Sequence, residues 1–230
     1  MPSTHCKTGI YRSSLMIRNL IFDFDGTIAD TTRGIILCTQ ATLREMGLPV
    51  AADERIQATI GLPLRTCFEL GTDTPEERLD EAVVTYRRLF DDVAVPHVVL
   101  FDGVVQTLQD LHDRGLRLSI ATSRSGASLL MLLSVLGIGE YFCELAATEA
   151  VRNPKPAPDL ALLLMERLGA RQEETIVIGD TVFDLKMGQN AGCRVCGVSF
   201  GNQTRAELAT VSPDWIIDRF PALLDVVAEG

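Results

Sequence analysis

The sequence has no apolar run approaching the roughly 18 to 20 residues of a membrane-spanning helix. Its first residues, MPSTHCKTGIYRSSL, contain too few apolar side chains for a signal peptide. We therefore expect a cytoplasmic protein that is not bound to a membrane. We also expect residues 1–15 to form a flexible tail, because a strand-like segment begins directly after Met16.

Basic residues are scarce. The chain has 21 Lys and Arg against 31 Asp and Glu, which gives a formal net charge of −10. This balance argues against general binding to nucleic acid or to an anionic membrane. An anionic ligand would need a local positive charge, such as a metal ion or one positioned lysine.

The six cysteines include one CxxC pair, Cys193 and Cys196, which could be a redox or metal-binding motif. The surrounding GCRVCGV is typical of a strand, however, and positions i and i+3 of a strand point to opposite faces. We therefore expect buried, reduced cysteines here.

The pattern that is present is an alternation of short apolar runs with amphipathic segments. At 230 residues and 47% apolar content, the chain can form a folded domain, or a main domain that carries a smaller one. The apolar runs are expected strands at residues 20–22, 116–121, 143–147, 175–179, 194–198 and 215–217. This order predicts an α/β fold, a Rossmann-like three-layer core with a parallel sheet between helices.

Residues 31–95 interrupt this alternation with helical patterns and no convincing strand. Leu79, Val83, Tyr86 and Phe90, for example, follow a helical spacing. An ordinary crossover needs only one helix, so we expect an inserted helical cap domain at 31–95, with 16–30 and 96–230 forming the core. The alternative is an elaborate crossover with extra helices.

Polar residues directly follow three of the expected strands. Asp23 follows LIF, Thr122 follows LSIA, and Asp180 follows IVIG. Because parallel strands end at one edge of a sheet, these residues should gather there, and open α/β sheets bind ligands at that edge.

Asp23 and Asp25 stand two residues apart, and Gly26 allows the backbone to turn tightly after them. A solvated Asp-Gly turn is the alternative for this pair taken alone. A calcium loop is excluded, because the twelfth position from Asp23 is Gly34 where such a loop needs glutamate.

A second acidic pair, Asp180 and Asp184, occurs in GDTVFD near the expected start of a helix. Several carboxylates at one edge are tolerable when a divalent cation binds among them, and oxygen ligands suit Mg²⁺. Lys155 lies in NPKPAPD, where two prolines stiffen the loop, and it could neutralise a phosphate next to the metal.

With these residues identified, the chain resembles the haloacid dehalogenase superfamily in its phosphatase branch. The four motifs occur in order as DFDGT at 23–27, ATS at 121–123, NPKPAP at 153–158 and GDTVFD at 179–184. The helical insertion after the first motif matches the family's small cap. Within the branch, the layout is most similar to that of phosphoglycolate phosphatases.

The resemblance implies roles for five catalytic-site residues. Asp23 would be the nucleophile that forms an aspartyl-phosphate, and Asp25 would be the general acid and then the base. Thr122 and the N–H of Ser123 would hold the phosphoryl oxygens, and Lys155 would pair with both the nucleophile and the phosphate. Asn is common in the family at the position of Ser123, a minor departure because the backbone N–H carries the role.

The resemblance also implies a Mg²⁺ site. Its ligands would be the Asp23 carboxylate, the Asp25 backbone carbonyl and Asp180. Asp184 would not bind the ion itself but would support these ligands. Gly26 would present backbone N–H groups to the substrate. The true dehalogenases lack an aspartate two residues after the nucleophile, so Asp25 favours phosphoryl transfer over carbon–halogen cleavage.

The cap should select the substrate, and Arg65 is our candidate for binding a substrate carboxylate or second phosphate. A solvated helix residue is the alternative for Arg65. We expect a small phosphorylated substrate, no nucleic-acid or membrane partner, and a monomer or homodimer.

Other functions remain open at this point. A sugar phosphomutase would keep every core motif, but we find no lysine-bearing cap motif of the β-phosphoglucomutase kind. An inorganic pyrophosphatase is harder to dismiss. A phospho-acceptor signalling module of the receiver type would be half this length and need no cap, and a catalytically silent binding protein would be expected to have lost motif residues.

Overall fold

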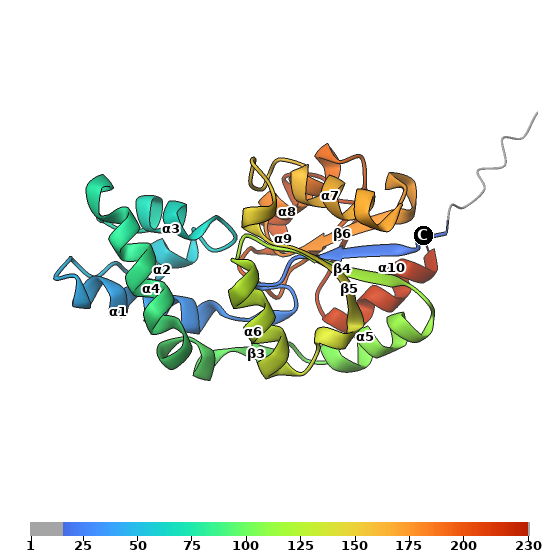
Figure 1. The fold of residues 1–230 in the computed structure, drawn as a ribbon. Coiled ribbons are helices and arrows are strands. Elements are labelled where there is room, and N and C mark those ends of the chain that lie inside the picture. Colours follow the sequence, from blue (N-terminus) through green and yellow to red (C-terminus); the bar gives the residue numbers. More distant parts are fainter. Residues whose placement is uncertain (1–15, 230) are drawn as a thin grey trace, which may run out of the picture.

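The computed structural model describes residues 16–229, so the expectation of a flexible tail at residues 1–15 lies outside the described residues. Its centre is a six-stranded, fully parallel sheet with the strand order β5-β4-β1-β6-β7-β8 (Figure 1). The strands are β1 Asn19–Phe22, β4 Arg117–Ala121, β5 Phe142–Ala146, β6 Thr175–Gly179, β7 Arg194–Val198 and β8 Trp215–Ile217. All six expected strands are confirmed, with bounds within one residue of those expected. The expected α/β fold class is confirmed as well.

Helices cover both faces of this sheet, which gives the three layers (Figure 1). They are α5 Val104–Asp113, α6 Gly126–Leu136, α7 Asp159–Leu168, α8 Val182–Asn190, α9 Arg205–Ala209 and α10 Leu223–Glu229. Single turns of 3₁₀ helix are η3 Gly139–Tyr141, η4 Thr148–Ala150, η5 Gln172–Glu174 and η6 Phe220–Ala222. Among residues 16–229, no helix is long and apolar enough to cross a membrane.

Two buried hydrophobic clusters hold the layers together, one on each face of the sheet. Phe22 and Ile178 belong to the larger cluster, which also takes in α6, whereas Ile21 and Val177 belong to the smaller cluster under α7 and α8. Adjacent residues of a strand point to opposite faces, so each apolar run supplies both clusters.

The CxxC cysteines follow the same alternation. Cys193 lies in the smaller cluster, with its Sγ 3.6 Å from Sδ of Met165, and Cys196 lies in the larger one. Both are free thiols, and burial raises the pKa of each to about 12. The expectation of buried, reduced cysteines on opposite faces is confirmed.

The helices between residues 32 and 93 form a separate lobe at the left of Figure 1, which we call the cap lobe. It contains α1 Thr32–Glu45, α2 Asp53–Gln57, α3 Leu64–Gly71 and α4 Leu79–Val93, with 3₁₀ turns η1 Glu76–Arg78 and η2 Val95–His97. On α4, Leu79, Tyr86 and Phe90 are buried as their spacing predicts, while Val83 is half-buried.

A short antiparallel pair of strands joins the cap lobe to the sheet domain. β2 Ala29–Asp30 pairs with β3 Val99–Leu100. The segment that leaves the sheet domain for the cap lobe therefore lies beside the segment that returns from it. We did not predict these strands, because two residues are too few to show an alternating pattern.

Candidate active site

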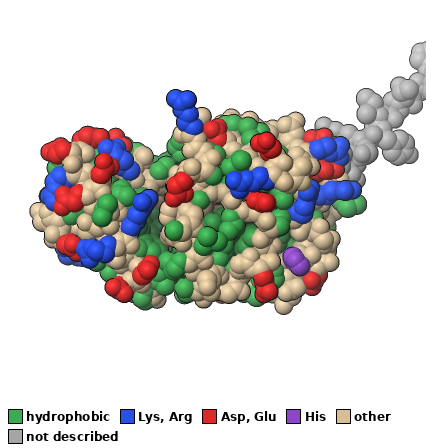
Figure 2. Space-filling view, viewed as in Figure 1, with side chains coloured by type: hydrophobic (Ala, Val, Ile, Leu, Met, Phe, Trp, Pro, Cys, Tyr) green, Lys and Arg blue, Asp and Glu red, His purple; other side chains and the backbone are tan. Residues whose placement is uncertain are grey.

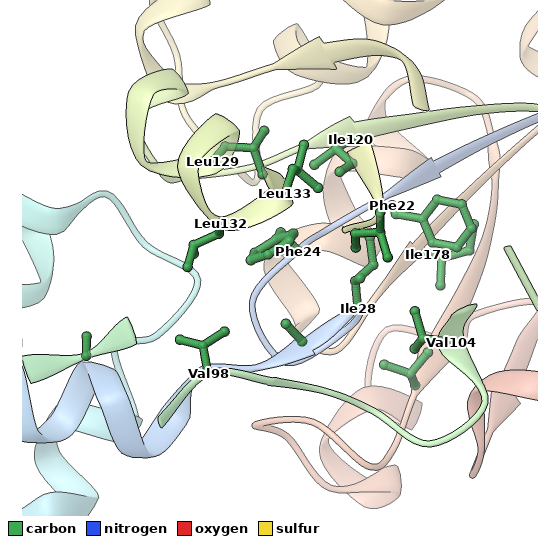
Figure 3. Packing of buried hydrophobic residues seen from close by; sticks show 14 of the residues in the cluster. Phe22, Phe24, Ile28, Val98, Val104, Ile120, Leu129, Leu132, Leu133 and Ile178 are labelled. Carbon is green, nitrogen blue, oxygen red and sulfur yellow. The ribbon is translucent and has the colours of Figure 1, made fainter. Parts of the chain in front are cut away.

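Asp23 and Asp25 share one side of the chain because Phe24 between them points the other way. Phe24 is completely buried and packs beside Leu132 and Leu133 of α6 (Figure 3). The N–H of Asp23 donates to the carbonyl oxygen of Ile178 at 2.8 Å, which extends the pairing of β1 with β6 by one residue. Both aspartates are buried, with exposed fractions of 3% and 9%, so they do not form a solvated turn.

Lys155 lies between two of the acidic groups. Its Nζ donates to Oδ1 of Asp23 at 2.5 Å and to Oδ1 of Asp184 at 2.6 Å, and its side chain is fully buried. Burial alone would favour the neutral amine, but the carboxylates of Asp184 and Asp23 raise the pKa of Lys155 above its ordinary value. A permanent positive charge therefore lies directly beside the Asp23 carboxylate.

The carboxylates of Asp23, Asp180 and Asp184 form a compact, buried cluster. One oxygen from each lies within 4.8 Å of the others. Burial, with added repulsion from Asp184, Asp180 and Asp25, raises the pKa of Asp23 well above its ordinary value even though Lys155 opposes the shift. Oδ2 of Asp23 is buried without a hydrogen-bond partner among the described residues. A hard divalent cation such as Mg²⁺ fits this donor set, because it would satisfy that oxygen and offset the repulsion.

Asp180 is oriented by Asn202, a residue that the sequence did not single out. The backbone N–H and the side-chain amide of Asn202 both donate to Oδ2 of Asp180, at 2.7 Å and 2.8 Å. Thr27 donates to the other oxygen, Oδ1, at 3.4 Å. Burial and the nearby carboxylate of Asp184 raise the pKa of Asp180 to about 7.

Asp184 has a structural task as well as an electrostatic one. Its Oδ2 accepts from the N–H of Thr181 at 3.1 Å and from the Thr181 hydroxyl at 2.6 Å, which caps the first turn of α8. Its Oδ1 accepts from Lys155. One carboxylate therefore ties the start of a helix to the buried lysine.

Two glycines let the backbone approach the acidic cluster closely. Gly26 has φ of +82°, and a Cβ there would lie 2.1 Å from Oδ2 of Asp180. A Cβ on Gly201 would lie 2.3 Å from the carbonyl oxygen of Gly26 and 2.4 Å from Cβ of Asp180. The loop before β2 and the loop after β7 can meet at Asp180 because both positions lack a side chain.

Thr122 and Ser123 follow β4 at the same edge of the sheet. Thr122 is fully buried, and its hydroxyl accepts from the N–H of Arg124 at 3.1 Å. The hydroxyl of Ser123 donates to the carbonyl oxygen of Gly61 at 2.7 Å. Since Gly61 belongs to the cap lobe, this hydrogen bond joins that lobe to the loop that follows β4.

Arg124 is the main site residue that sequence reasoning missed. Its Nε lies 2.9 Å from Oδ2 of Asp25, and its Nη2 lies 2.7 Å from Oδ1. Thr31 also donates to Oδ1 of Asp25, at 2.5 Å. The guanidinium carbon of Arg124 lies 4.8 Å from the centroid of the Phe90 ring, on the cap lobe. The available signal was an arginine two residues after Thr122, in a chain with few basic residues.

Arg65 pairs with acidic residues of the cap lobe and not with the cluster of Asp23, Asp180 and Asp184. Its Nη2 contacts Glu76 at 2.7 Å and its Nε contacts Asp80 at 3.2 Å, all within the cap lobe. Arg65 also lines the cavity between the cap lobe and the sheet domain. Its binding of a substrate anion remains a prediction, and its charge is already matched by two acids.

A cavity of about 500 Å³ separates the cap lobe from the sheet domain. Asp23, Asp25, Ser123 and Arg124 line it from the core, and residues of α3 and α4 line it from the cap. Figure 2 shows the surface hollowed where the two lobes meet, with hydrophobic side chains in the hollow. Asp23 and Asp25 therefore border a partly enclosed space that can hold a small molecule, whereas Thr122 and Lys155 do not line it.

Comparison with known proteins gives a family and several relatives. The model of the haloacid dehalogenase-like hydrolases matches residues 20–198. The chain is 38% identical to the "Probable phosphatase IndB" of Dickeya dadantii, over 87% of this chain and 89% of that protein. It is 33% identical to a phosphoglycolate phosphatase of Salmonella typhimurium, over 90% and 91%. It is 31% identical to the pyrophosphatase PpaX of Halalkalibacterium halodurans, over 92% and 97%.

The fold agrees with these matches. A crystal structure of a haloacid dehalogenase-like hydrolase from Bacteroides fragilis superposes with a TM-score of 0.85 and 30% identity, over 90% of this chain and 99% of that one. The family match spans all four motifs, and the superposition includes nearly the whole described structure. This chain therefore belongs to the haloacid dehalogenase-like hydrolases.

Proposed function

We propose that this hydrolase is a Mg²⁺-dependent phosphatase that cleaves a small phosphate monoester through an aspartyl-phosphate. One observation carries the proposal. The buried Asp23 carboxylate has one oxygen held by Lys155 and the other without a partner among the described residues, next to two more buried carboxylates. This is the arrangement expected of a nucleophile that must approach an anionic substrate.

In the first step, the Asp23 carboxylate attacks phosphorus. A bond forms between an Asp23 oxygen and phosphorus as the bond from phosphorus to the leaving oxygen breaks. Asp25 gives its proton to that oxygen, so the leaving group departs as an alcohol. In the second step, Asp25 takes a proton from water as the water attacks phosphorus, which releases phosphate and regenerates the Asp23 carboxylate.

Lys155 and the cation site reduce the repulsion between the Asp23 carboxylate and the phosphate of the substrate. The ammonium of Lys155, 2.5 Å from Oδ1 of Asp23, offsets the negative charge of both partners. Asp23 and Asp180 would hold Mg²⁺ with the Asp25 carbonyl, while Asp184 keeps Lys155 in place. Bound Mg²⁺ supplies Lewis-acid stabilisation of the phosphoryl oxygens.

Two substrates are candidates for this phosphatase. Phosphoglycolate is the first candidate, because the motif layout resembles that of phosphoglycolate phosphatases and a relative at 33% identity carries that name. Inorganic pyrophosphate is the second, because a relative at 31% identity is named a pyrophosphatase. The same core residues would serve either reaction.

The test is phosphate release from p-nitrophenyl phosphate by the purified protein. We expect hydrolysis with Mg²⁺, and none after the metal is removed with EDTA. Asp23→Asn should abolish turnover, and the control Asp92→Asn, at an exposed position of α4, should retain it. Metal-independent hydrolysis, or full activity of Asp23→Asn, would refute the mechanism.

A further inference from the structure

The wall of the cavity between the lobes carries no excess positive charge. Its lining includes three arginines and four aspartates, namely Arg65, Arg87, Arg124, Asp23, Asp25, Asp80 and Asp91. The leaving group of phosphoglycolate is glycolate, which carries a carboxylate, and the leaving group of pyrophosphate is phosphate. Either leaving group therefore brings negative charge into this space. A site selective for such a group would be expected to hold a buried cation that no acidic side chain compensates.

The arginines of the wall offer little of that charge. Arg124 is bound to Asp25, and Arg65 contacts Glu76 and Asp80. Arg87 makes no ion pair within residues 16–229, but it is solvent-exposed and one helical turn from Asp91 on α4. Water and Asp91 therefore weaken any attraction between Arg87 and a ligand.

Most of the remaining wall is apolar. It includes side chains from the Gly61–Pro63 loop, α3, α4 and α6, among them Leu62, Leu64, Phe68, Val83, Phe90 and Met131. At about 500 Å³, the space is several times larger than glycolate needs and lies within the range of pockets that enclose whole organic ligands.

Val83 shows that part of this apolar surface faces the cavity and is not packed into the core of the cap lobe. It shares a helical face with Leu79, Tyr86 and Phe90. Tyr86 and Phe90 also line the cavity, but those three residues are buried whereas Val83 is half-buried. Leu64 and Met131 are likewise half-buried there. An apolar ligand group would remove this surface from water, which is favourable in proportion to the area covered.

We propose that the preferred substrate is a phosphate monoester with an uncharged, largely apolar leaving group about the size of a six-membered ring. The proposal rests on the phosphatase function above and specifies its substrate class. The phosphate lies against Asp23 and Lys155, and the leaving group lies between Val83, Leu64 and Met131. This substrate preference would distinguish the chain from its relatives that are named as a phosphoglycolate phosphatase and a pyrophosphatase.

The test compares kcat/KM, with Mg²⁺ present, for methyl, butyl, hexyl and benzyl phosphate, phosphoglycolate and pyrophosphate. The leaving-group acidity hardly changes along the alkyl series, so the series reports on apolar contact. We expect kcat/KM to rise by up to about fourfold per methylene, the equivalent of about 0.8 kcal/mol for a buried CH₂ group. The kcat/KM for benzyl phosphate should exceed that for phosphoglycolate by about tenfold or more.

A matched pair of variants ties the preference to the cavity. Val83→Thr keeps the side-chain shape but adds a hydroxyl to the wall, and we expect it to lower the ratio of benzyl to methyl phosphate roughly threefold. Val84→Thr makes the same change at a neighbouring position that is 67% exposed and should leave the ratio unchanged.

The outcomes separate the two proposals. A flat alkyl series, or a preference for phosphoglycolate or pyrophosphate, would overturn the apolar leaving group while leaving the phosphatase function in place. Failure of the folded protein to hydrolyse any of these esters with Mg²⁺ would overturn both. Equal effects of Val83→Thr and Val84→Thr on the ratio would also overturn the assignment to this cavity.

Discussion

Arg124 binds the carboxylate of Asp25 through two nitrogens, Nε at 2.9 Å and Nη2 at 2.7 Å, although 99 positions separate the two residues. The contact is largely shielded from solvent, with 9% of the Arg124 side chain and 11% of the Asp25 side chain exposed. A two-pronged ion pair of this kind fixes the direction of a carboxylate as well as its charge. The proposed acid–base residue is thus oriented by the loop that follows β4.

Arg124→Met should lower kcat, because Asp25 would lose the group that orients it. Losing a charged hydrogen bond costs about 1.5–3 kcal/mol, which corresponds to roughly a tenfold to hundredfold slower reaction. The measurement is a double-mutant cycle with Asp25→Asn, in which Arg124→Met should add little further loss. Faster turnover of Arg124→Met would instead mean that the arginine holds Asp25 in an idle position.

Asp25→Asn should slow steady-state turnover by roughly 10² to 10⁴, the usual contribution of general acid–base catalysis. The Asp23 nucleophile remains, so a phosphoenzyme should still form from an ester with a good leaving group and then persist. Rapid-quench mass spectrometry would detect its additional phosphoryl group. Wild-type turnover of Asp25→Asn would show that the proton comes from elsewhere.

Without a divalent cation, the stability of the protein should fall as the pH rises from about 4 to 7. The pKa of Asp180 is about 7 in the folded protein against an ordinary value of 3.8, so in this window the folded state keeps a proton that the unfolded state has lost. Folding then becomes less favourable as the pH increases. The raised pKa of Asp23 acts in the same direction.

The measurement is Tm at pH 5 and pH 8, with EDTA or with Mg²⁺. Mg²⁺ should raise Tm more at pH 8, where the carboxylates are ionised. Asp180→Asn removes one titrating group and should show a smaller fall in Tm between the two pH values in EDTA. Identical falls for the variant and the wild type would contradict a raised pKa at Asp180.

Gly201→Ala should damage the cation site. Its Cβ would lie 2.3 Å from the Gly26 carbonyl oxygen and 2.4 Å from Cβ of Asp180, so the loop or Asp180 must shift. We expect a loss of about 1–3 kcal/mol in stability, and roughly tenfold or more Mg²⁺ for half-maximal activity. In the control Gly139→Ala, the nearest atom would be Cβ of Leu133 at 3.7 Å, an ordinary contact, and the Mg²⁺ requirement should not change.

Much of the fold was predictable because buried parallel strands leave a strong local signal. Residues 175–179 and 194–198 are short apolar runs, and both are strands with these bounds. The pair β2 and β3 left no such signal, since its two-residue strands form only because the two ends of residues 31–95 return to the same place. Helical spacing likewise predicted the buried face of α4, but not that Val83 on this face lines a cavity.

The sequence by itself determined the set of reactive side chains at one edge of the sheet. Asp23, Thr122 and Asp180 each follow an apolar run, and parallel strands carry such residues to the same edge. Only the tertiary structure decided that Arg124 meets Asp25, that Asn202 orients Asp180 and that Ser123 meets the cap at Gly61. These contacts join distant positions through loops, where no periodic pattern records which partner lies opposite, so packing alone sets them.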